Sequence, residues 1–383
     1  MKRRKVLFLS TWYPHRYDAM AGLFVQKHAQ AVSRFAEVCV LFTYADSQVA
    51  DYEIVTNTVQ NVREVIVYYP KPKEPVQKLA RFVRAFQKGF AEIKKTWGMP
   101  ELTHTHILTR TGFLAYLLQK KYGIPYVVTE QWSRYLPEKN TYSGFVRKLL
   151  TQIVVRNAKA LLPVSQTLAD AMKHSGLHSD SVTCIGNVVD DFFYEPQPKD
   201  VREKKRILHV SCFDEKAKNM CGILRAIQRL SDERFDFELV MIGTGPDYNA
   251  VVAEAHNFEM LNSVVRFVGE QTPQQVSDWM QQSDFFVLFS NYETFATVIP
   301  ESLASGLPVI SSEVGIAPSI ITKETGLLVP VGDEDALYSS IDWMLNHFQE
   351  FDSQRIRNCA LPFSFEKIGR QLYDVYESVI VRS

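Results

Sequence analysis

Short runs of β-branched and aromatic residues alternate along the whole chain with longer stretches in which apolar residues recur at helical spacing. A short apolar run bounded by polar residues is typical of a strand buried on both faces, and a longer periodic stretch is typical of a helix. Repeated alternation of the two favours parallel sheets covered by helices on both faces. The pattern therefore predicts an α/β fold of doubly wound, Rossmann-like sheets.

The alternation occurs in two blocks that are separated by a segment rich in proline and charge, FFYEPQPKDVREKK. In the first block, the expected strands are KVLFLS, EVCVLFTY, EVIVYY, LTHTH, PYVVT and ALLPVS, and the expected helices span 23–35, 78–95, 111–121, 144–158 and 166–175. In the second block, the expected strands are RILHVSC, FELVMIG, VVRFVG, DFFVLFS, PVISS and GLLVPV, and the expected helices span 222–230, 246–257, 272–282, 297–305 and 334–346. Two Rossmann-like domains in one chain would face each other across a cleft.

The length of 383 residues supports two domains, because a single hydrophobic core stops growing at roughly 250–300 residues. We expect a first domain over 1–195, a linker over 196–205, a second domain over 206–363 and a final helical segment over 364–383. Ligands of such sheets bind beyond the carboxyl ends of the strands, so the loops that follow strands are where a site is expected.

Charge and cysteine content exclude several classes of protein. The 43 basic residues balance the 43 acidic ones, so nucleic acid is not expected as the main partner. The five cysteines are scattered, which argues against a disulfide framework or a structural zinc site and favours a reducing cytoplasm. The apolar run near the N-terminus is too short for a signal peptide, and no run approaches the roughly 20 apolar residues of a membrane span.

The stretch NYETFATVIPESLASGLPV, after the expected strand DFFVLFS, carries the most informative chemistry. Pro300 suits a first helical turn and Gly306 suits a left-handed stop, so a short helix is expected between them. Backbone N–H groups of residues 295–298 at its start would bind an anion such as a diphosphate, while Glu293 and Glu301 would accept hydrogen bonds from hydroxyls. A sugar nucleotide offers both features. The alternative is that Glu301 only complements the helix dipole and Glu293 is a solvated loop acid.

Two other loops after strands are candidates for phosphate contact. SCFDEKAKN carries Lys216, Lys218 and Asn219 near an expected helix start, where a lysine would neutralise a diphosphate; a solvated charged loop is the alternative. MIGTGP places Gly-Thr-Gly after a strand but lacks the third glycine of a dinucleotide fingerprint, so no nicotinamide cofactor is expected.

With these elements in place, the chain resembles the retaining glycosyltransferases of family 4, which have the GT-B fold. YETFATVIPESLASGLPVISSEVG is similar to the E-x7-E segment of that family, and LVMIGTGPDY, VRFVGEQTPQQVSDWMQQSDFFVLFS and ETGLLVPVGDEDAL follow family segments in the same order. In the first half, FLSTWYPHRYDAMAGLFVQKHAQAV, HTH with GIPYVVTEQWS, and IGNVVDDFF also resemble it.

The resemblance implies roles for individual residues. Glu301 would bind the ribose hydroxyls, Glu293 the transferred sugar, and Lys218 would offset the charge of the leaving group. The final segment would cross back onto the first domain. The donor-binding set would further comprise the backbone of Phe295, Ala296, Thr297 and Val298, together with Gly22, Ser211 and Gly243.

Three positions depart from the family pattern. Cys212 stands where the family usually has an arginine, Gln131 where a histidine is common, and Ser319 where an acid is often found. Glutamine exchanges hydrogen bonds with a sugar hydroxyl but does not titrate. These departures keep open a second interpretation, a sugar-nucleotide-binding protein that no longer catalyses and serves as partner of an active transferase.

The implied reaction is transfer of a sugar from a UDP- or GDP-sugar to an acceptor hydroxyl with retention at the anomeric carbon. The departing diphosphate would help to deprotonate the acceptor, so Gln131 is compatible with catalysis. No cofactor and no metal are expected; His104 and His106 share one strand face, but no third ligand is apparent.

The acceptor, a saccharide or lipid-linked saccharide, is constrained less. Trp12, Tyr13, His106 and Trp132 are the acceptor-side candidates, and packing is the alternative for each. The segment 71–95 interleaves eight basic residues with apolar ones, which suits peripheral contact with an anionic membrane or, equally, a helix with a buried aromatic face. The basic residues are Lys71, Lys73, Lys78, Arg81, Arg84, Lys88, Lys94 and Lys95.

Overall fold

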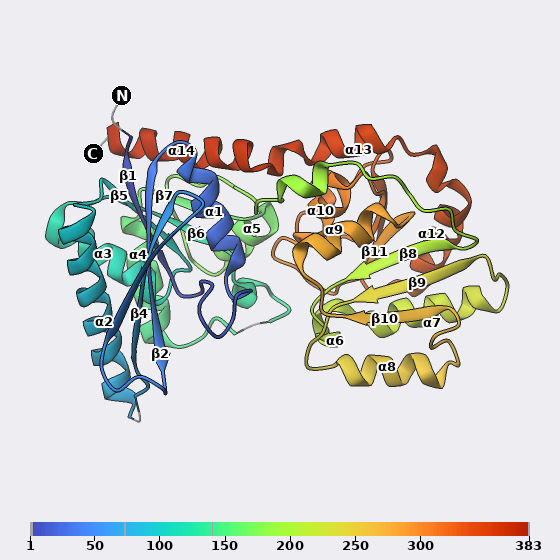
Figure 1. Cartoon of the computed structure of the whole chain (residues 1–383), viewed down its shortest axis with the longest axis horizontal. Helices are drawn as coiled ribbons and strands as arrows, with labels where there is room; N and C mark the ends of the chain where they lie inside the picture. The colour runs from blue at the N-terminus through green and yellow to red at the C-terminus, as the bar shows by residue number, and fades with distance from the viewer. Residues whose placement is uncertain (1–2, 73, 140, 382–383) are drawn as a thin grey trace. The chain divides into compact units, whose positions relative to one another are not determined.

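The computed structural model describes residues 3–72, 74–139 and 141–381 (Figure 1). The chain divides into two compact units. Unit 1 comprises Met1–Val188 and Phe365–Ser383, and unit 2 comprises Val189–Ser364. Each unit contains one sheet of mainly or entirely parallel strands, as the alternation of strand and helix patterns predicts.

The sheet of unit 1 has seven strands in the order β3-β4-β2-β1-β5-β6-β7. Its strands are β1 (Lys5–Ser10), β2 (Glu37–Asp46), β3 (Glu53–Val59), β4 (Val62–Pro70), β5 (Leu102–His106), β6 (Tyr126–Glu130) and β7 (Ala160–Pro163). β1, β5, β6 and β7 are buried over nearly their whole length. β1 and β7 are mostly apolar, as expected for strands covered on both faces, whereas β5 (LTHTH) also buries two threonines and two histidines.

Among the described strands of unit 1, only β3 was not expected from the sequence. It is antiparallel to β4, lies at the sheet edge and has no buried residue, so its sequence EIVTNTV lacks the apolar run of its neighbours. Gln60 and Asn61 join the two strands, both at positive φ (46° and 65°). That is the conformation of a two-residue hairpin turn, and Asn61 is a residue that tolerates it.

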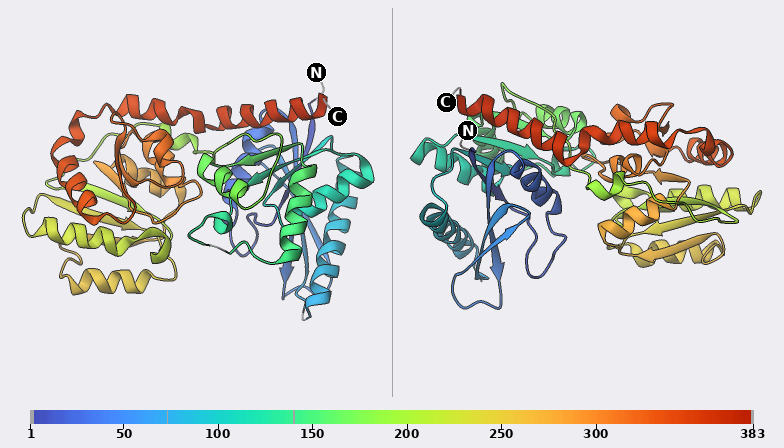
Figure 2. Two further views of the ribbon diagram at one scale, coloured as in Figure 1. Left: turned by 180° about the vertical axis from the view of Figure 1, so that it is seen from behind. Right: turned by 45° about the horizontal axis from the view of Figure 1, so that its top comes forward.

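The helices of unit 1 cover both faces of its sheet (Figure 2). They are α1 (Leu23–Ser33), α2 (Pro75–Thr96), α3 (Arg110–Tyr122), α4 (Phe145–Asn157), α5 (Gln166–His174) and α14 (Phe365–Val381). α14, red in Figure 1, packs along α1 although the two are more than 300 residues apart. A Cβ at Gly369 would lie 2.3 Å from the Ala31 carbonyl oxygen, so the glycine permits this close packing.

Unit 2 has a fully parallel six-stranded sheet in the order β10-β9-β8-β11-β12-β13. The strands are β8 (Lys205–Val210), β9 (Phe237–Ile242), β10 (Val265–Gly269), β11 (Phe285–Leu288), β12 (Val309–Ser312) and β13 (Gly326–Val329). The helices are α6 (Glu215–Lys218), α7 (Met220–Ser231), α8 (Tyr248–Asn257), α9 (Pro273–Gln281), α10 (Val298–Ala304), α11 (Ala317–Ile320), α12 (Glu334–His347) and α13 (Ser353–Ala360).

The segment expected as a linker, 196–205, is attached to unit 2. Arg202 donates two hydrogen bonds to the carboxylate of Asp284, at 3.1 and 3.2 Å, and Lys199 Nζ donates to the Ser283 carbonyl oxygen. The boundaries of the two units fall at Val188/Val189 and Ser364/Phe365. Charged residues of this segment therefore attach it to unit 2.

Candidate active site

Two of the expected catalytic side chains meet at the carboxyl edge of the unit 2 sheet. β8 and β11 are hydrogen-bonded neighbours, so the loops that follow them lie together. Lys218 Nζ forms an ion pair with Glu293 Oε1, and Ser290 Oγ donates a hydrogen bond to the same oxygen at 3.0 Å. The side chains of Lys218 and Glu293 are 19% and 12% exposed, so the pair is largely shielded from solvent yet still accessible.

Lys218 is positioned by the local capping of two consecutive helices. Asp214 caps α6 by accepting the N–H of Ala217, and Asn219 then turns the chain in the left-handed conformation (φ 48°). The Glu215 carboxylate accepts the N–H groups of Met220 and Cys221 at the start of α7. The acidic and basic residues of SCFDEKAKN thus divide into capping groups and a lysine that is directed at Glu293.

Ser211 and Gly243 lie in two loops that contact each other closely through their backbones. The N–H of Phe213 donates to the Thr244 carbonyl oxygen at 3.0 Å, and a Cβ at Gly243 would lie only 1.8 Å from the Ser211 carbonyl oxygen. Gly245 is also restricted, since its Cβ would lie 2.6 Å from Phe213 N. The close approach of the two loops therefore accounts for both glycines of MIGTGP.

Ser211 also hydrogen-bonds a buried histidine. Ser211 Oγ lies 2.8 Å from His209 Nε2, and His209 Nδ1 lies 2.9 Å from the Val287 carbonyl oxygen. Because a carbonyl only accepts, Nδ1 carries the proton and Nε2 accepts from the serine. Burial lowers the pKa of His209 to about 4, so the ring is neutral near pH 7.

The loop before α10 has an unusual backbone. Ala296 has φ 69°, a left-handed conformation that is uncommon for a residue other than glycine. Phe295 is 2% exposed and packs edge-on against Phe363, while Gly315 lies so close that its Cβ would be 2.7 Å from the Phe295 carbonyl oxygen. This packing fixes the path of the four residues whose backbone was expected to bind the donor, Phe295, Ala296, Thr297 and Val298.

α10 has the expected bounds almost to the residue. It begins at Val298 and carries Pro300 in its first turn. Gly306 ends it at φ 76°, with Gly306 N–H donating to Leu303 and Leu307 N–H donating to Ser302, the two bonds of a Schellman motif. Glu301 lies in the first turn of α10. The pKa of Tyr194 is raised mainly by burial, and the negative charges of Asp191 and Glu301 add to the rise.

Two of the three departures from the family pattern have clear surroundings. Cys212 is exposed beside the Lys218–Glu293 pair; burial raises the pKa of its thiol, and the charge of Lys218 acts against that rise. Ser319 is exposed in α11, and its hydroxyl donates to the Ile316 carbonyl oxygen at 2.7 Å. Neither replaces the charge that the family usually has there.

Gln131, the third departure, lies after β6 in unit 1. Within the part of the chain that the structure describes, its buried Nε2 has no hydrogen-bond partner. The residue before it, Glu130, is fully buried and was not singled out from the sequence. Its carboxylate accepts the N–H groups of Leu108, Gln131 and Trp132 at 2.9–3.0 Å. Burial raises the pKa of Glu130, and the three N–H groups act against the rise.

Glu130 therefore holds two loops of unit 1 in place. One follows β6 and carries Gln131 and Trp132; the other follows β5, where Ile107 has φ 73°, a strained value for a β-branched residue. Trp132 packs against Trp12 with ring centroids 5.2 Å apart, and Trp12 is 37% exposed. The only sequence signal for Glu130 was an acid at the end of an apolar strand.

Gly22 and two acceptor-side candidates have structural roles. Gly22 is left-handed at the start of α1, where its Cβ would lie 2.3 Å from the Trp12 carbonyl oxygen. Tyr13 and His106 are both 0% exposed, which agrees with the packing alternative, although Tyr13 also lines the first cavity described below. Their assignment to the acceptor side stays a prediction. Tyr13 donates its hydroxyl to Glu64 at 2.6 Å, and His106 Nε2 lies 3.1 Å from His28 Nδ1.

His104 and His106 form a buried cluster with His28. His104 contacts the Tyr376 hydroxyl at 2.6 Å and the Thr129 hydroxyl at 2.7 Å, so both of its ring nitrogens are used. Among the described residues no group of three histidine, cysteine or acidic side chains has the arrangement of a metal site.

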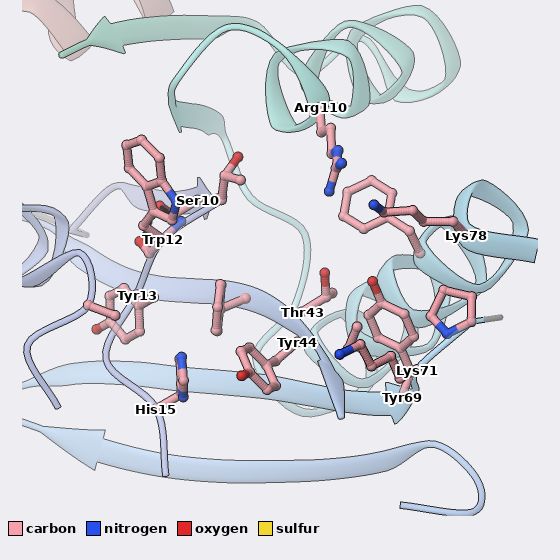
Figure 3. Close-up of a pocket in the computed structure, with 16 residues that line it drawn as sticks. Ser10, Trp12, Tyr13, His15, Thr43, Tyr44, Tyr69, Lys71, Lys78 and Arg110 are labelled. Atoms are coloured by element: carbon pink, nitrogen blue, oxygen red, sulfur yellow. Dashed lines mark hydrogen bonds between the residues drawn. The ribbon is translucent and has the colours of Figure 1, made fainter. Parts of the chain in front are cut away.

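Unit 1 has two cavities at the carboxyl ends of its strands. The first, of about 310 Å³, is shown in Figure 3. It is lined by Ser10, Thr11, Trp12, Tyr13, His15, Ala21, Phe42, Thr43, Tyr44, Ala45, Tyr69, Lys71, Pro72, Lys78, Phe82 and Arg110. The second, of about 480 Å³, shares Thr11, Trp12 and Arg110 with it and adds Trp132, Arg134 and Arg147, among others.

The basic segment 71–95 forms α2, which begins at Pro75. Phe86 and Phe90 are buried, as the packing alternative predicts, whereas Leu79 is 67% exposed. Lys73 lies outside the described residues. Within the described ranges, no helix combines the length and apolarity needed to cross a membrane.

Two Rossmann-like units in one chain are the architecture of the GT-B fold, and comparison with known proteins identifies a glycosyltransferase. Residues 24–188 match the model of the glycosyl transferase 4-like domain, and residues 204–347 match that of glycosyl transferases group 1. The chain belongs to glycosyltransferase family 4.

Individual relatives are distant. Alpha-monoglucosyldiacylglycerol synthase of Streptococcus pneumoniae is 24% identical over 383 residues, covering 94% of this chain and 86% of that protein. N-acetyl-alpha-D-glucosaminyl L-malate synthase of Bacillus anthracis is 24% identical over 60% of this chain, which spans 62% of that protein. The structure of HepE from Anabaena in complex with UDP superposes with a TM-score of 0.74 at 16% identity, covering 98% of this chain and 100% of HepE.

Proposed function

We propose that the protein transfers a sugar from a UDP- or GDP-sugar to an acceptor hydroxyl with retention at the anomeric carbon, in the assembly of a cell-surface polysaccharide or glycolipid. The observation that carries the proposal is the Lys218–Glu293 pair, which Ser290 supports at the carboxyl edge of the unit 2 sheet. The names of the glycolipid synthase and of the UDP complex among the similar proteins are consistent with it.

In the free protein Lys218 and Glu293 neutralise each other. When a donor binds, we expect its diphosphate to replace Glu293 as the partner of Lys218, so that the carboxylate can accept hydrogen bonds from the transferred sugar. Lys218 and the N–H groups at the start of α10 would then stabilise the negative charge that develops on the leaving oxygen. Glu301 would hold the ribose hydroxyls.

Nucleotide release from a panel of UDP-, GDP- and ADP-sugars tests the proposal. Lys218→Ala should lower turnover roughly 10²- to 10³-fold while changing donor affinity much less, because the lysine acts mainly on charge formed in the transition state. Lys216→Ala is the matched control, since Lys216 is exposed on the same short helix and should leave turnover unchanged. A loss of affinity alone would make Lys218 a ground-state ligand and contradict the assigned role.

A sugar-nucleotide-binding partner without transfer activity is the second candidate. Cys212 favours this candidate, because this uncharged side chain near Lys218 stands where the family usually has an arginine. Nucleotide binding in a calorimeter without nucleotide release, for any donor and acceptor tried, would select this candidate over the transferase.

We further propose a cytoplasmic protein that needs no metal and contacts the membrane only peripherally. Free cysteines at all five positions fit a reducing compartment. Activity should persist in EDTA. The cations Arg84, Lys88 and Lys95 of α2 are exposed, so the protein should co-sediment with anionic vesicles in a salt-sensitive manner. If no co-sedimentation is measured, the proposed membrane contact is wrong.

A further inference from the structure

Three cations from three separate segments converge on the first cavity of unit 1. Lys71 follows β4, Lys78 lies on α2, and Arg110 is the first residue of α3. In Figure 3 the side chains of Arg110 and Lys78 point into the same space, with Lys71 and Tyr69 on the opposite side of it. Because Arg110 is far from the other two in sequence, their meeting does not follow from the basic character of one helix.

No acidic residue is among the described residues that line this cavity. Three carboxylates near lining residues are already engaged. That of Asp18, whose charge acts on His15, accepts the N–H groups of Met20 and Ala21. Asp46 pairs with Arg16 and accepts the Tyr17 hydroxyl at 2.9 Å, and Glu64 accepts the Tyr13 hydroxyl at 2.6 Å. The cavity lining therefore carries a net positive charge, which attracts an anion.

The remaining lining suits a sugar ring. Trp12 offers an exposed aromatic face, and the hydroxyl of Thr43 lies at the centre of the view in Figure 3. Thr11 Oγ1 is buried and has no hydrogen-bond partner within the described part of the chain. Burial lowers the pKa of His15, so this residue adds an aromatic surface rather than a fourth charge. Aromatic faces stack on the apolar side of sugars while hydroxyls and cations bind their polar edge.

The neighbouring cavity extends the same chemistry. It shares Thr11, Trp12 and Arg110 with the first cavity and adds the cations Arg134 and Arg147, again with no acid among its described lining residues. Both volumes, about 310 and 480 Å³, fall in the range of small-ligand sites, roughly 300–1,000 Å³. Together they offer room for an acceptor longer than one monosaccharide.

We propose that the two cavities bind the acceptor, and that the acceptor is an anionic saccharide. Its carboxylate or phosphate ester is held by Lys71, Lys78 and Arg110, and a neighbouring ring stacks on Trp12. This inference rests on the proposed transferase function and adds the chemical class of the acceptor to it.

Matched pairs of acceptors that differ only in charge test the inference. Methyl glucuronide is compared with methyl glucoside, and glucose 6-phosphate with glucose, so that the two pairs separate a carboxylate from a phosphate as the recognised group. Binding is measured by saturation-transfer NMR without donor, and transfer as kcat/KM with the active donor. At least one anionic member should bind and react about tenfold better than its neutral partner.

Variants then assign the preference to the cavity. Lys78→Gln with Arg110→Gln should lower binding and kcat/KM for the preferred anionic acceptor about 100-fold and leave the neutral partner within threefold. Lys173→Gln, which removes an exposed lysine of α5, is the control for net charge and should change neither. Equal use of charged and neutral acceptors, or an equal loss on both in the double variant, overturns the inference.

Different results contradict the anionic acceptor and the transferase function. Donor turnover with no preference for charge overturns only the anionic acceptor. Selective binding of the anionic sugar, lost in the double variant, supports the cavity assignment even where nucleotide release is absent and the transferase function fails.

Discussion

The two candidate sites differ in how their charges are balanced. In unit 2 the lysine that was expected to meet the donor is paired with Glu293, so its charge is already balanced in the free protein. In unit 1 the described lining of the cavity has three cations and no carboxylate. The first arrangement is suited to a ligand that exchanges one partner for another, and the second to a ligand that supplies the missing negative charge.

The sites also differ in what supports them. The site in unit 2 rests on backbone approaching backbone, at Gly243, Gly245 and Gly315, with Ala296 in a left-handed conformation between them. The loops of unit 1 rest on buried side chains, chiefly Glu130 and the cluster of His28, His104 and His106. Steric change should therefore disrupt unit 2 most, and acid should disrupt unit 1 most through its three buried histidines.

The largest effect is expected from Gly243→Ala. The new Cβ would lie 1.8 Å from the Ser211 carbonyl oxygen. Moving either backbone away would break the hydrogen bond between Phe213 N–H and the Thr244 carbonyl oxygen that joins the two loops. We expect a loss of at least about 5 kcal/mol in the free energy of unfolding of unit 2. Gly269→Ala is the control: its φ is also positive, at 78°, but nothing lies within 4 Å of its Cβ, so about 1 kcal/mol is expected. Urea unfolding followed by hydrogen exchange assigns each loss to its unit.

Acid should weaken unit 1 more than unit 2. Burial lowers the pKa of His28 to about 4 and lowers the pKa of His104 and His106 well below the ordinary value, whereas unit 2 has one comparable residue, His209. Below pH 6.5 the unfolded chain binds protons that these folded histidines do not, so stability falls with pH. At pH 5.5 the loss is on the order of 1 kcal/mol for each of these histidines, and the raised pKa of Glu130, which favours its protonation in the folded state, offsets part of the loss in unit 1.

Hydrogen exchange at pH 7.5 and 5.5 measures this difference. Amides of β1, β5 and α14 should lose protection before those of β8 and β11. His178→Gln, an exposed histidine of unit 1, should not change the profile, whereas His28→Gln should reduce the acid sensitivity of unit 1. Simultaneous loss in both units would contradict the assignment to the histidine cluster.

The fold was predictable because buried parallel strands leave an unambiguous apolar run. α10 is the clearest case: Pro300 and Gly306 fixed both of its ends within one residue. β3 shows the limit, since an edge strand with polar residues on both faces has no period to read. The attachment of segment 196–205 to unit 2 depends on ion pairs with residues about 80 positions away, which no local pattern reveals.

Contacts of the site could be predicted where both interacting residues belong to one sequence motif. Contacts between residues far apart in the sequence were harder to predict. Lys218 and Glu293 are 75 residues apart, and only the resemblance to family 4 linked them. Glu130 acts through backbone N–H groups, which have no sequence signal. A loop or strand-end position does not determine exposure: the side chains of His106 and Tyr13 are both buried, although Tyr13 also lines the first cavity of unit 1.

Glu293→Gln tests the exchange of partners proposed for unit 2. The variant frees Lys218 from competition, so UDP, which lacks the sugar, should bind about fivefold more tightly, as expected for a partly shielded pair worth about 1 kcal/mol. Transfer should become slower, because the amide is a weaker acceptor for sugar hydroxyls. Ser290→Ala, which removes the hydrogen bond at 3.0 Å but keeps the charge, should leave UDP affinity nearly unchanged. Weaker UDP binding to Glu293→Gln in calorimetry would show that the carboxylate does not compete for Lys218.

The smallest effect is expected from restoring a cation beside the pair with Cys212→Arg. Cys212 is exposed and close enough to Lys218 for the lysine to affect the pKa of its thiol, so an arginine there reaches the same region without a new buried charge. Since an exposed charge contributes at most about 1 kcal/mol, UDP affinity should rise no more than about fivefold and weaken with salt. Cys359→Arg, an exposed position on α13, is the control for net charge. The arginine should act on the diphosphate and not on the sugar acceptor, so the preference of unit 1 for charged acceptors should stay the same. A change in that preference would show that the charges of one site affect binding at the other.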